Sequence, residues 1–463
     1  MRGPGIRAAT SSIRSRPAIF VAGFVSMFLG SVVVGSFASL LATGLDAGTS
    51  AVDQESLVTM ASVVGGWGLV IVLFSVASTM TVSVHQRTAE IGLIRALGAV
   101  PRQMRRQLTT ETAVLGAVAC LLAVLPATLL GRRVFSLVQE GGMVTPGLQH
   151  VAGLPYVLTA SALVLVVSLA AVRVAAHRAT GQPADIAMRA GATQGTRVPR
   201  LSRWRVLAAV LAFAAGASMS ALTLTVMRDQ EDPYASMQTA GPAGILWSLG
   251  FVLLSPLLLR GAARVLGGVL SRFGVPGYLA SYDARRRSHL LAGILAPVIV
   301  LVGMGLGTLY LMAIENQAPS VLGELVTEAD AATLETLNYV VVGMISTFAA
   351  IMVVNTVAAL VVDRRREFGQ QRLAGATPQQ VVATNVLEAA LVAVTGLVVG
   401  GIASLGTIVP YSLVKLDRVV PDVTALWWVL VWTLAVAVTV GSSWVAVRRA
   451  MRQPALEAVG AVT

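Results

Sequence analysis

The sequence predicts an all-α integral membrane protein, and three observations support that prediction. The 463-residue chain is 56% hydrophobic and only 12% charged, and its mean hydropathy is +0.78. Uncharged runs of about 20 residues, the length that a helix needs to cross a bilayer, recur along the whole chain. The basic residues gather in short clusters between these runs. This composition excludes a set of soluble domains.

Ten apolar runs are long enough to span a membrane as helices. They cover approximately residues 18–44, 62–84, 112–131, 153–172, 206–227, 241–259, 290–314, 338–362, 389–409 and 424–447. The first run is longer than the apolar core of a signal peptide, so we expect it to be retained. An even number of spans places both termini on the same side of the membrane.

The basic residues predict which side that is. With both termini in the cytoplasm, most of the 34 basic residues lie in or beside cytoplasmic segments; the exceptions are Arg132, Arg133, Arg228, Lys415 and Arg418. This distribution satisfies the positive-inside rule. The net charge of +12 is thereby explained by topology. Because no stacking aromatic residues accompany the basic clusters, we expect no nucleic-acid partner.

One segment occurs twice in the chain. Residues 85–111, HQRTAEIGLIRALGAVPRQMRRQLTTE, match residues 362–388 at a constant offset of 277. The identical positions are Arg87, Glu90, Gly92, Arg95, Gly98, Ala99, Pro101, Gln103 and Glu111, which pair with Arg364, Glu367, Gly369, Arg372, Gly375, Ala376, Pro378, Gln380 and Glu388. A solvated loop that only carries positive charge does not require glutamate, glycine and proline at the same spacing. We therefore expect a shared function for the two copies.

The repeated unit contains four predicted spans. Residues 1–190 and 277–463 form two halves that run in the same direction, and residues 191–276 form a connector with the fifth and sixth spans. In each half a basic segment, residues 9–20 or 280–291, precedes the first span and is typical of a helix at the membrane surface. The predicted architecture is two parallel four-helix bundles joined by two linker helices.

Helix signals explain the spacing inside the motif. Residues 90–97 are expected to form a short helix, Gly98 suits the left-handed position after it, and Pro101 suits the first turn of the next helix. Ile91, Ile94 and Leu97 would form an apolar stripe on this helix, which requires a protein or membrane surface to bury it.

The second copy carries a better start signal for its next helix. Thr377 is an N-cap residue and Gln380 is its partner in a capping box, whereas Val100 of the first copy has no side-chain acceptor.

Several function classes are excluded by what the chain lacks. No predicted span carries a charged residue near its middle, as a proton- or sodium-coupled transporter usually does. The four histidines, His85, His150, His177 and His289, lie at span ends or in loops, and Cys120 is a single cysteine in an apolar run. We therefore expect no metal site, no cofactor and no disulfide in this chain.

Catalysis is not expected either. A phosphate-binding loop needs a lysine after a glycine-rich turn, and Lys415 is the sole lysine. The chain is therefore expected to be no enzyme, and any ATP and magnesium would be bound by a partner.

The motif EIGLIRALGA, followed by PRQM and by a glutamate at the start of the next span, resembles the signature of FtsX-like permeases, the membrane subunits of the MacB and LolC type of ABC transporters. The resemblance covers both halves. It implies that each motif is a cytoplasmic coupling helix that docks on an ATPase, in the cytoplasmic membrane of a bacterium. The residues that carry over are Glu90, Ile91, Gly92, Ile94, Arg95, Leu97, Gly98 and Glu111, and Glu367, Phe368, Gly369, Arg372, Gly375 and Glu388.

The resemblance also implies partners and an activity. One permease chain would bind two copies of a cytoplasmic ATPase, within membrane lipids, and export or extract an amphiphilic, lipidic or peptide substrate. The second motif reads EFGQQRLAGA and replaces Leu93 and Ile94 with Gln370 and Gln371, so we expect unequal ATPase contacts. Two alternatives remain: an FtsX-type regulator that relays the ATPase cycle to an extracytoplasmic partner, and a secondary facilitator. The short outer loops, about residues 45–61 and 315–337, disfavour the regulator.

Overall fold

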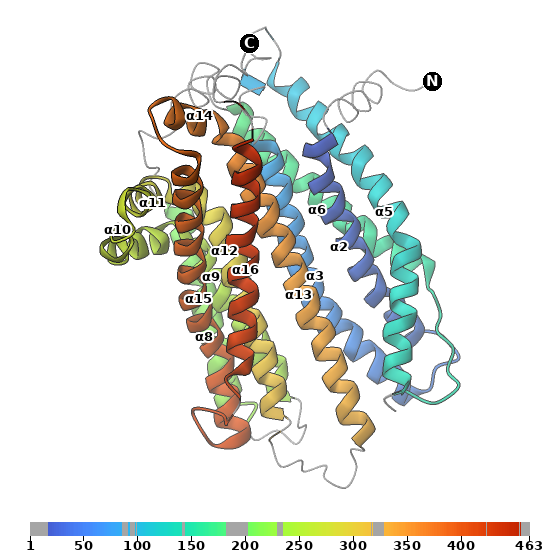
Figure 1. Cartoon of the computed structure of the whole chain (residues 1–463). Coiled ribbons are helices and arrows are strands. Elements are labelled where there is room, and N and C mark those ends of the chain that lie inside the picture. The colour runs from blue at the N-terminus through green and yellow to red at the C-terminus, as the bar shows by residue number, and fades with distance from the viewer. Residues whose placement is uncertain are drawn as a thin grey trace, which may run out of the picture. The chain divides into compact units, whose positions relative to one another are not determined.

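The computed structural model describes residues 17–85, 91–92, 98, 100–140, 144–181, 202–228, 235–315, 317, 328–422, 424–452 and 454. Over these residues it is helical and contains no β-strand, which confirms the predicted all-α class (Figure 1). The long helices are α2 (Pro17–Gly44), α3 (Ala51–His85), α5 (Pro101–Glu140), α6 (Leu154–Gly181), α8 (Arg203–Thr225), α9 (Ala235–Val265), α12 (Ser288–Glu315), α13 (Glu328–Asp363), α15 (Pro378–Leu416) and α16 (Leu426–Ala450). The short helices are α10 (Gly267–Ser271), α11 (Gly274–Arg286) and α14 (Arg365–Leu373).

Each predicted span lies within or largely within one of the long helices. Among the described residues, eight helices are long and apolar enough to cross a membrane. A ninth candidate is the pair formed by residues 346–362 of α13 and by α14, which meet at a bend of 48°. The chain thus has the helices of a multi-pass membrane protein, and the count of ten spans stays a prediction.

The chain divides into two compact units. Unit 1 comprises residues 1–194 and 324–344, and unit 2 comprises residues 195–323 and 345–463. In unit 1, α2 packs against α3, α5 and α6. In unit 2, α12 packs against α9, α15 and α16, and α11 packs against α15.

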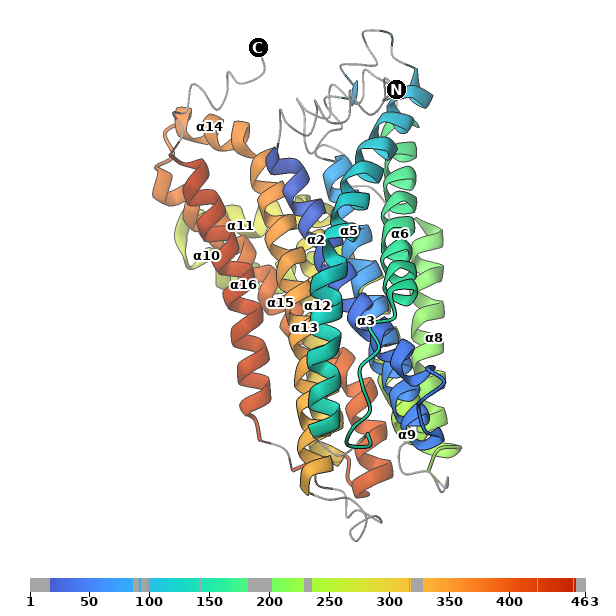
Figure 2. The ribbon, with the colours of Figure 1, turned by 90° about the vertical axis from the view of Figure 1, so that its right-hand side faces the viewer.

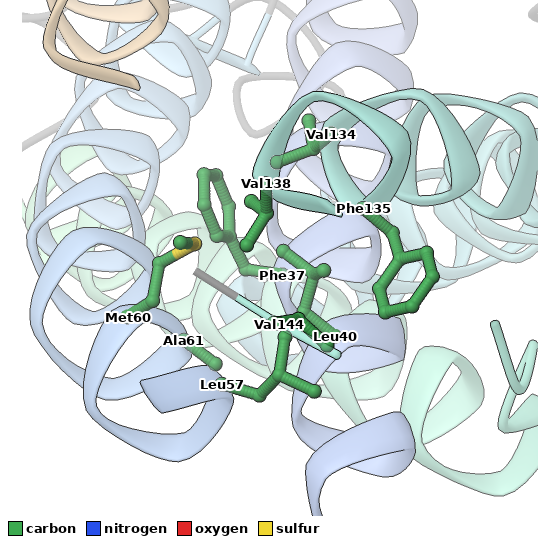
Figure 3. Close-up of a cluster of buried hydrophobic side chains, with 9 residues drawn as sticks. All are labelled: Phe37, Leu40, Leu57, Met60, Ala61, Val134, Phe135, Val138 and Val144. Carbon is green, nitrogen blue, oxygen red and sulfur yellow. The ribbon is translucent and has the colours of Figure 1, made fainter. Parts of the chain in front are cut away.

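A buried apolar cluster holds α2, α3 and α5 together in unit 1. Its members are Phe37, Leu40, Leu57, Met60, Ala61, Val134, Phe135, Val138 and Val144 (Figure 3). Close backbone approach accompanies this packing, because a Cβ on Gly131 of α5 would lie 2.0 Å from the Ser39 Oγ of α2. Small residues at helix contacts are typical of membrane proteins, in which van der Waals packing rather than water exclusion drives association.

The predicted connector helices pack within unit 2 against the second half. Thr407 Oγ1 of α15 donates a hydrogen bond to the Ala240 carbonyl of α9 at 2.9 Å, and Ser220 Oγ of α8 donates to the Gly406 carbonyl at 2.8 Å. A Cβ at Gly406 would lie 2.2 Å from the Trp247 ring. Helices α8 and α9 are therefore held to α15 by both polar bonds and a glycine contact.

The second copy of the motif has the local structure that its sequence predicts. Helix α14 ends in a Schellman motif, with Gly375 N–H donating to Arg372 O and Ala376 N–H to Gln371 O. The φ angles of Gly375 and Gly98 are 99° and 101°, so both glycines occupy the positive-φ position expected of them. These angles are accessible to glycine at little cost.

The start of the next helix also follows the prediction. Thr377 and Gln380 form a reciprocal capping box at the start of α15. In the first copy only one of the two hydrogen bonds of a capping box is present, donated by Val100 N–H to Gln103 Oε1 at 3.3 Å. Of the two basic lead-in segments, the first lies mostly outside the described residues, and the second covers the last seven residues of α11 and the first four of α12.

Candidate functional site: a buried charged cluster beside α14

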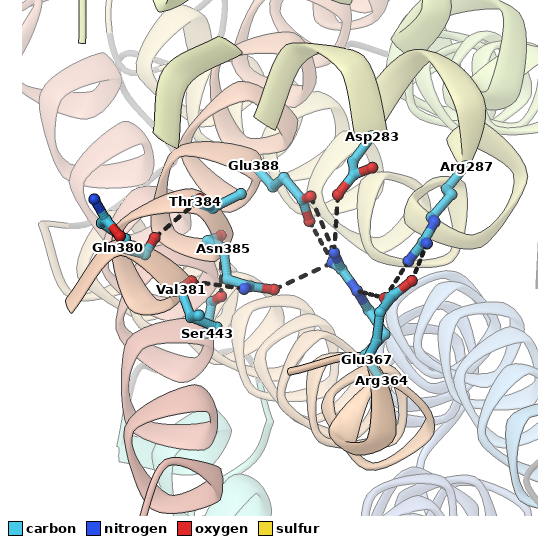
Figure 4. Close-up of polar contacts among 10 residues, drawn as sticks. All are labelled: Asp283, Arg287, Arg364, Glu367, Gln380, Val381, Thr384, Asn385, Glu388 and Ser443. Carbon is cyan, nitrogen blue, oxygen red and sulfur yellow. Dashed lines mark hydrogen bonds and ion pairs between the residues drawn. The ribbon is translucent and has the colours of Figure 1, made fainter. Parts of the chain in front are cut away.

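Arg364 lies between α13 and α14 and is the centre of a buried charged cluster (Figure 4). Its side chain is only 2% exposed. Nη1 donates to Glu388 Oε2 at 2.5 Å and to Asn385 Oδ1 at 3.1 Å, and Nη2 donates to Glu388 Oε1 at 3.3 Å and to Asp283 Oδ2 at 3.2 Å. Nε donates to Glu367 Oε2 at 3.2 Å. All five N–H groups of this guanidinium are therefore used.

Glu367, in the first turn of α14, joins a second arginine to the cluster. Both of its carboxylate oxygens accept hydrogen bonds from Arg287, at the junction of α11 and α12. Burial raises the pKa of Glu367, but the hydrogen bond from Arg287 and the charge of Arg364 outweigh it and hold this pKa below its usual value. The carboxylate is thus ionised and paired at neutral pH.

The cluster fastens α14 to two other elements of unit 2. Arg364 and Glu367 belong to the α14 end, Asp283 and Arg287 to α11 and its junction with α12, and Glu388 to α15. Removing one partner of a buried ion pair typically costs about 3–5 kcal/mol, because the remaining charge is left uncompensated. Helix α14, which lies crosswise at one end of the long helices of unit 2 in both views (Figures 1 and 2), is therefore tied to α11 and α15 by charge.

The carboxylate of Glu367 is paired within the chain and is partly buried. Its side chain is 26% exposed and contacts two arginines of the same chain. Arg372 lies five residues later in the helix, a spacing that does not place the two side chains side by side. The partners instead come from Arg364, one turn earlier, and from Arg287, which is distant in the sequence.

One apolar side chain of each motif is buried within the chain itself. Phe368 is 1% exposed, and Ile91, at the matching position of the first copy, is 2% exposed. Gly92 and Gly369 are also buried. The surface that buries this part of the predicted stripe is therefore not that of a partner.

Helix α14 presents a different face to the outside. Arg366, Gln370 and Leu373 are exposed, and their spacing of four and three residues places them on one side of the helix. Leu373 is 55% exposed. This face was not among the residues that the sequence indicated.

The remaining predicted site residues fall into two groups. Glu90, Ile94, Arg95 and Leu97 lie outside the described residues. Among the described ones, Glu111 of α5 is 1% exposed and accepts a hydrogen bond from Gln107 Nε2 at 3.2 Å, whereas Arg372 is half-buried in the last turn of α14. The structure thus brings Glu367 and Glu388 together around Arg364.

Sequence reasoning missed Asp283, Arg287 and Asn385 as members of the site. One signal was available, because Asp283 is the single acidic residue in the basic segment that precedes the seventh predicted span. Among the described residues, no group of three or more histidine, cysteine, aspartate or glutamate side chains could hold a metal ion. The ion pairs of Arg364 with Asp283, Glu367 and Glu388 make the cluster an ion-pair network.

Comparison with known proteins connects this site to a family. Residues 62–184 and 339–455 each match the family model described as FtsX-like permease C-terminal, and each segment contains one copy of the motif. A segment of 62 residues is 36% identical to part of the ABC transporter permease YtrF of Bacillus subtilis (strain 168). The matched segment covers 13% of this chain and 14% of that protein. Since the two matches to the family model together cover more than half of the sequence, this chain belongs to the FtsX-like permease family.

Proposed function

We propose that this chain is the permease subunit of an ABC transporter, in which α14 receives the movement of a separate ATPase. The cluster around Arg364 is the observation that carries the proposal. It joins the short crosswise helix α14 to α15, a 39-residue helix long enough to cross a membrane. A displacement of α14 would therefore act directly on a membrane-spanning helix.

Two routes lead from α14 into the helices of unit 2. Arg364 holds Glu388 of α15, and Glu367 holds Arg287, which immediately precedes α12. Among the candidate spans in the described part of the chain, α12 is the most enclosed, with 78% of its most apolar stretch buried inside the structure. A push on α14 would reach both α15 and α12, because charged pairs buried away from water are not readily broken.

The exposed face of α14 is the proposed docking surface for the ATPase. Arg366 and Gln370 provide hydrogen-bond donors, and Leu373 provides an exposed apolar side chain, as at the centre of many protein interfaces. With two copies of the motif in one chain, one permease would bind two ATPase subunits, each at one coupling helix. The ATPases would supply the bound ATP and magnesium, and the permease would contribute no catalytic residue.

The proposed location is the cytoplasmic membrane of a bacterium, with both termini and both motifs in the cytoplasm. Apart from five residues, the basic side chains agree with this orientation. Export or extraction of an amphiphilic, lipidic or peptide substrate would follow from changes in packing between the membrane-spanning helices. Such a substrate can enter from the lipid rather than from water.

Co-purification with the cognate ATPase tests the docking surface. The Leu373→Asp variant places a charge in the proposed contact and should lose the ATPase, since an unpaired charge in an apolar interface typically costs several kcal/mol. The Val420→Asp variant is the control, because Val420 is 75% exposed beyond the opposite end of α15. Retention of the ATPase by the Leu373→Asp variant would show that α14 is not the docking element.

A further inference from the structure

Four arginines surround an open pocket in unit 1, at the end of α5 that belongs to the first motif. The pocket has a volume of about 1080 Å³ and lies between α5 and α6. Its lining residues are Val100, Arg102, Gln103, Arg105, Arg106, Thr109, Thr110, Arg173, Val174 and His177. None of these described lining residues is acidic. Glu111, which follows Thr110, is buried and accepts a hydrogen bond from Gln107.

The charged groups of the pocket are arranged across two helices. Arg105 Nη1 donates a hydrogen bond to His177 Nδ1 at 2.7 Å, which connects α5 to α6 in the lining of the pocket. Arg102, Arg106 and Arg173 are exposed. Guanidinium groups bind phosphate oxygens through paired hydrogen bonds, so this arrangement suits a phosphate group.

Exposed apolar side chains lie farther along the same faces of α5 and α6. Leu121 lies about three helical turns beyond Thr110 on the same face of α5, and Val166 lies about three turns from His177 on the same face of α6. Leu121 is 67% exposed and Val166 is 60% exposed. A ligand with an anionic head and apolar chains would match both parts of this surface.

The matching residues of the second half cannot form such a pocket. At the offset of 277, Arg102, Arg105 and Arg106 correspond to Gln379, Val382 and Ala383. A general requirement for positive charge at the cytoplasmic ends of spans would not confine three arginines to one copy. The difference indicates a function specific to the first half.

We propose that this pocket binds the phosphate head group of an anionic phospholipid from the cytoplasmic leaflet, with the acyl chains along α5 and α6. The proposal rests on the cytoplasmic placement of the motif under the proposed function. Basic pockets between membrane helices on this side are a known means of binding anionic head groups. A water-soluble phosphate would share the head-group chemistry but would not use the apolar faces beyond it.

Native mass spectrometry of the purified full-length permease tests the proposal. The protein is released from detergent after addition of phosphatidylglycerol or phosphatidylcholine, and the bound lipid is counted. We expect preferential retention of phosphatidylglycerol. Replacing Arg105, Arg106 and Arg173 with glutamine should weaken its apparent affinity by about fivefold for each arginine, the equivalent of about 1 kcal/mol each.

The control carries Arg132→Gln and Arg133→Gln, two exposed arginines at the other end of α5. Equal retention by the triple variant and the wild type would overturn the proposal. Displacement of the lipid by millimolar inorganic phosphate would also overturn it, in favour of a site for a soluble phosphate. If the triple variant keeps its lipid but loses the ATPase, the pocket is a docking surface for protein. Failure of lipid binding with ATPase coupling intact leaves the proposed function standing.

Discussion

The guanidinium of Arg364 and the carboxylate of Glu388 form a two-point ion pair, with Nη1–Oε2 at 2.5 Å and Nη2–Oε1 at 3.3 Å. The two residues are separated by α14, by the turn at Gly375 and by the first turns of α15. Their side chains are 2% and 3% exposed. This pair connects the start of α14 directly to α15, across the turn that separates the two helices.

Loss of Arg364 should destabilise the protein strongly. The Arg364→Ala variant would leave Asp283, Glu367 and Glu388 without their shared cation, and a cost of about 3–5 kcal/mol is typical of such a change. The Arg364→Lys variant keeps the charge but not the five donors, so its loss should be intermediate. Thermal unfolding in detergent measures both. Arg366→Ala, on the exposed face of the same helix, is the control, and melting of Arg364→Ala at the wild-type temperature would contradict a structural role.

Glu367 and Arg287 should be energetically coupled. Each single substitution, Glu367→Ala or Arg287→Met, leaves a partly buried charge without its main partner. The double variant removes both charges and should lose less stability than the sum of the single variants. A double-mutant cycle from unfolding data gives the coupling. Additive losses would mean that the two side chains do not interact in the folded protein.

The contribution of Glu367 to the stability of the fold should depend on pH. Its pKa in the folded protein is below its usual value, because Arg287 and Arg364 outweigh the effect of burial. A lowered pKa stabilises the fold at pH values above the ordinary glutamate pKa of about 4.3, and this contribution is lost as the pH falls through the lowered value. The stability difference between wild type and Glu367→Gln should therefore be constant near neutral pH and shrink below about pH 4. A difference that stays constant down to pH 3 would contradict the ion pairing.

Leu373 and Val420 should lie on opposite sides of the membrane. Both side chains are exposed, and they lie beyond opposite ends of α15, which is long enough to span a bilayer. In intact cells an impermeant thiol reagent should label the Val420→Cys variant and not the Leu373→Cys variant. The native Cys120 is buried, so its background labelling should be low. Labelling of Leu373→Cys from outside would reverse the proposed orientation.

Local signals explain what could be predicted from the sequence. The capping box of Thr377 and Gln380, the positive φ of Gly375 and the helix between the two predicted spans all depend on residues close together in the chain. The 277-residue repeat identified the motif because identical spacing is readable without a structure. The all-α fold class and the position of the motif could therefore be predicted from sequence patterns alone.

The members of the cluster could not be predicted in the same way. Asp283 is 81 residues from Arg364, and the helical period carries no information about contacts between separate helices. The pairing of Glu367 could not be predicted for the same reason, since its partner Arg287 lies on another element. The exposed face of Arg366, Gln370 and Leu373 depends on which side of α14 the rest of the chain covers, and the burial of Phe368 and Gly369 defines that side.

The most direct test of the account measures ATP hydrolysis with the Glu388→Gln permease in proteoliposomes containing the cognate ATPase. This variant weakens the connection between α14 and α15 but leaves the exposed face of α14 unchanged, so the ATPase should still bind. Glu315→Gln is the matched control, because Glu315 is paired with Lys415 at the other end of the helices. We predict that permease-stimulated hydrolysis falls toward the rate of the isolated ATPase only in Glu388→Gln, with normal monodispersity. Full stimulation by an intact complex carrying Glu388→Gln would contradict the claim that the Arg364 cluster transmits the ATPase cycle into the membrane.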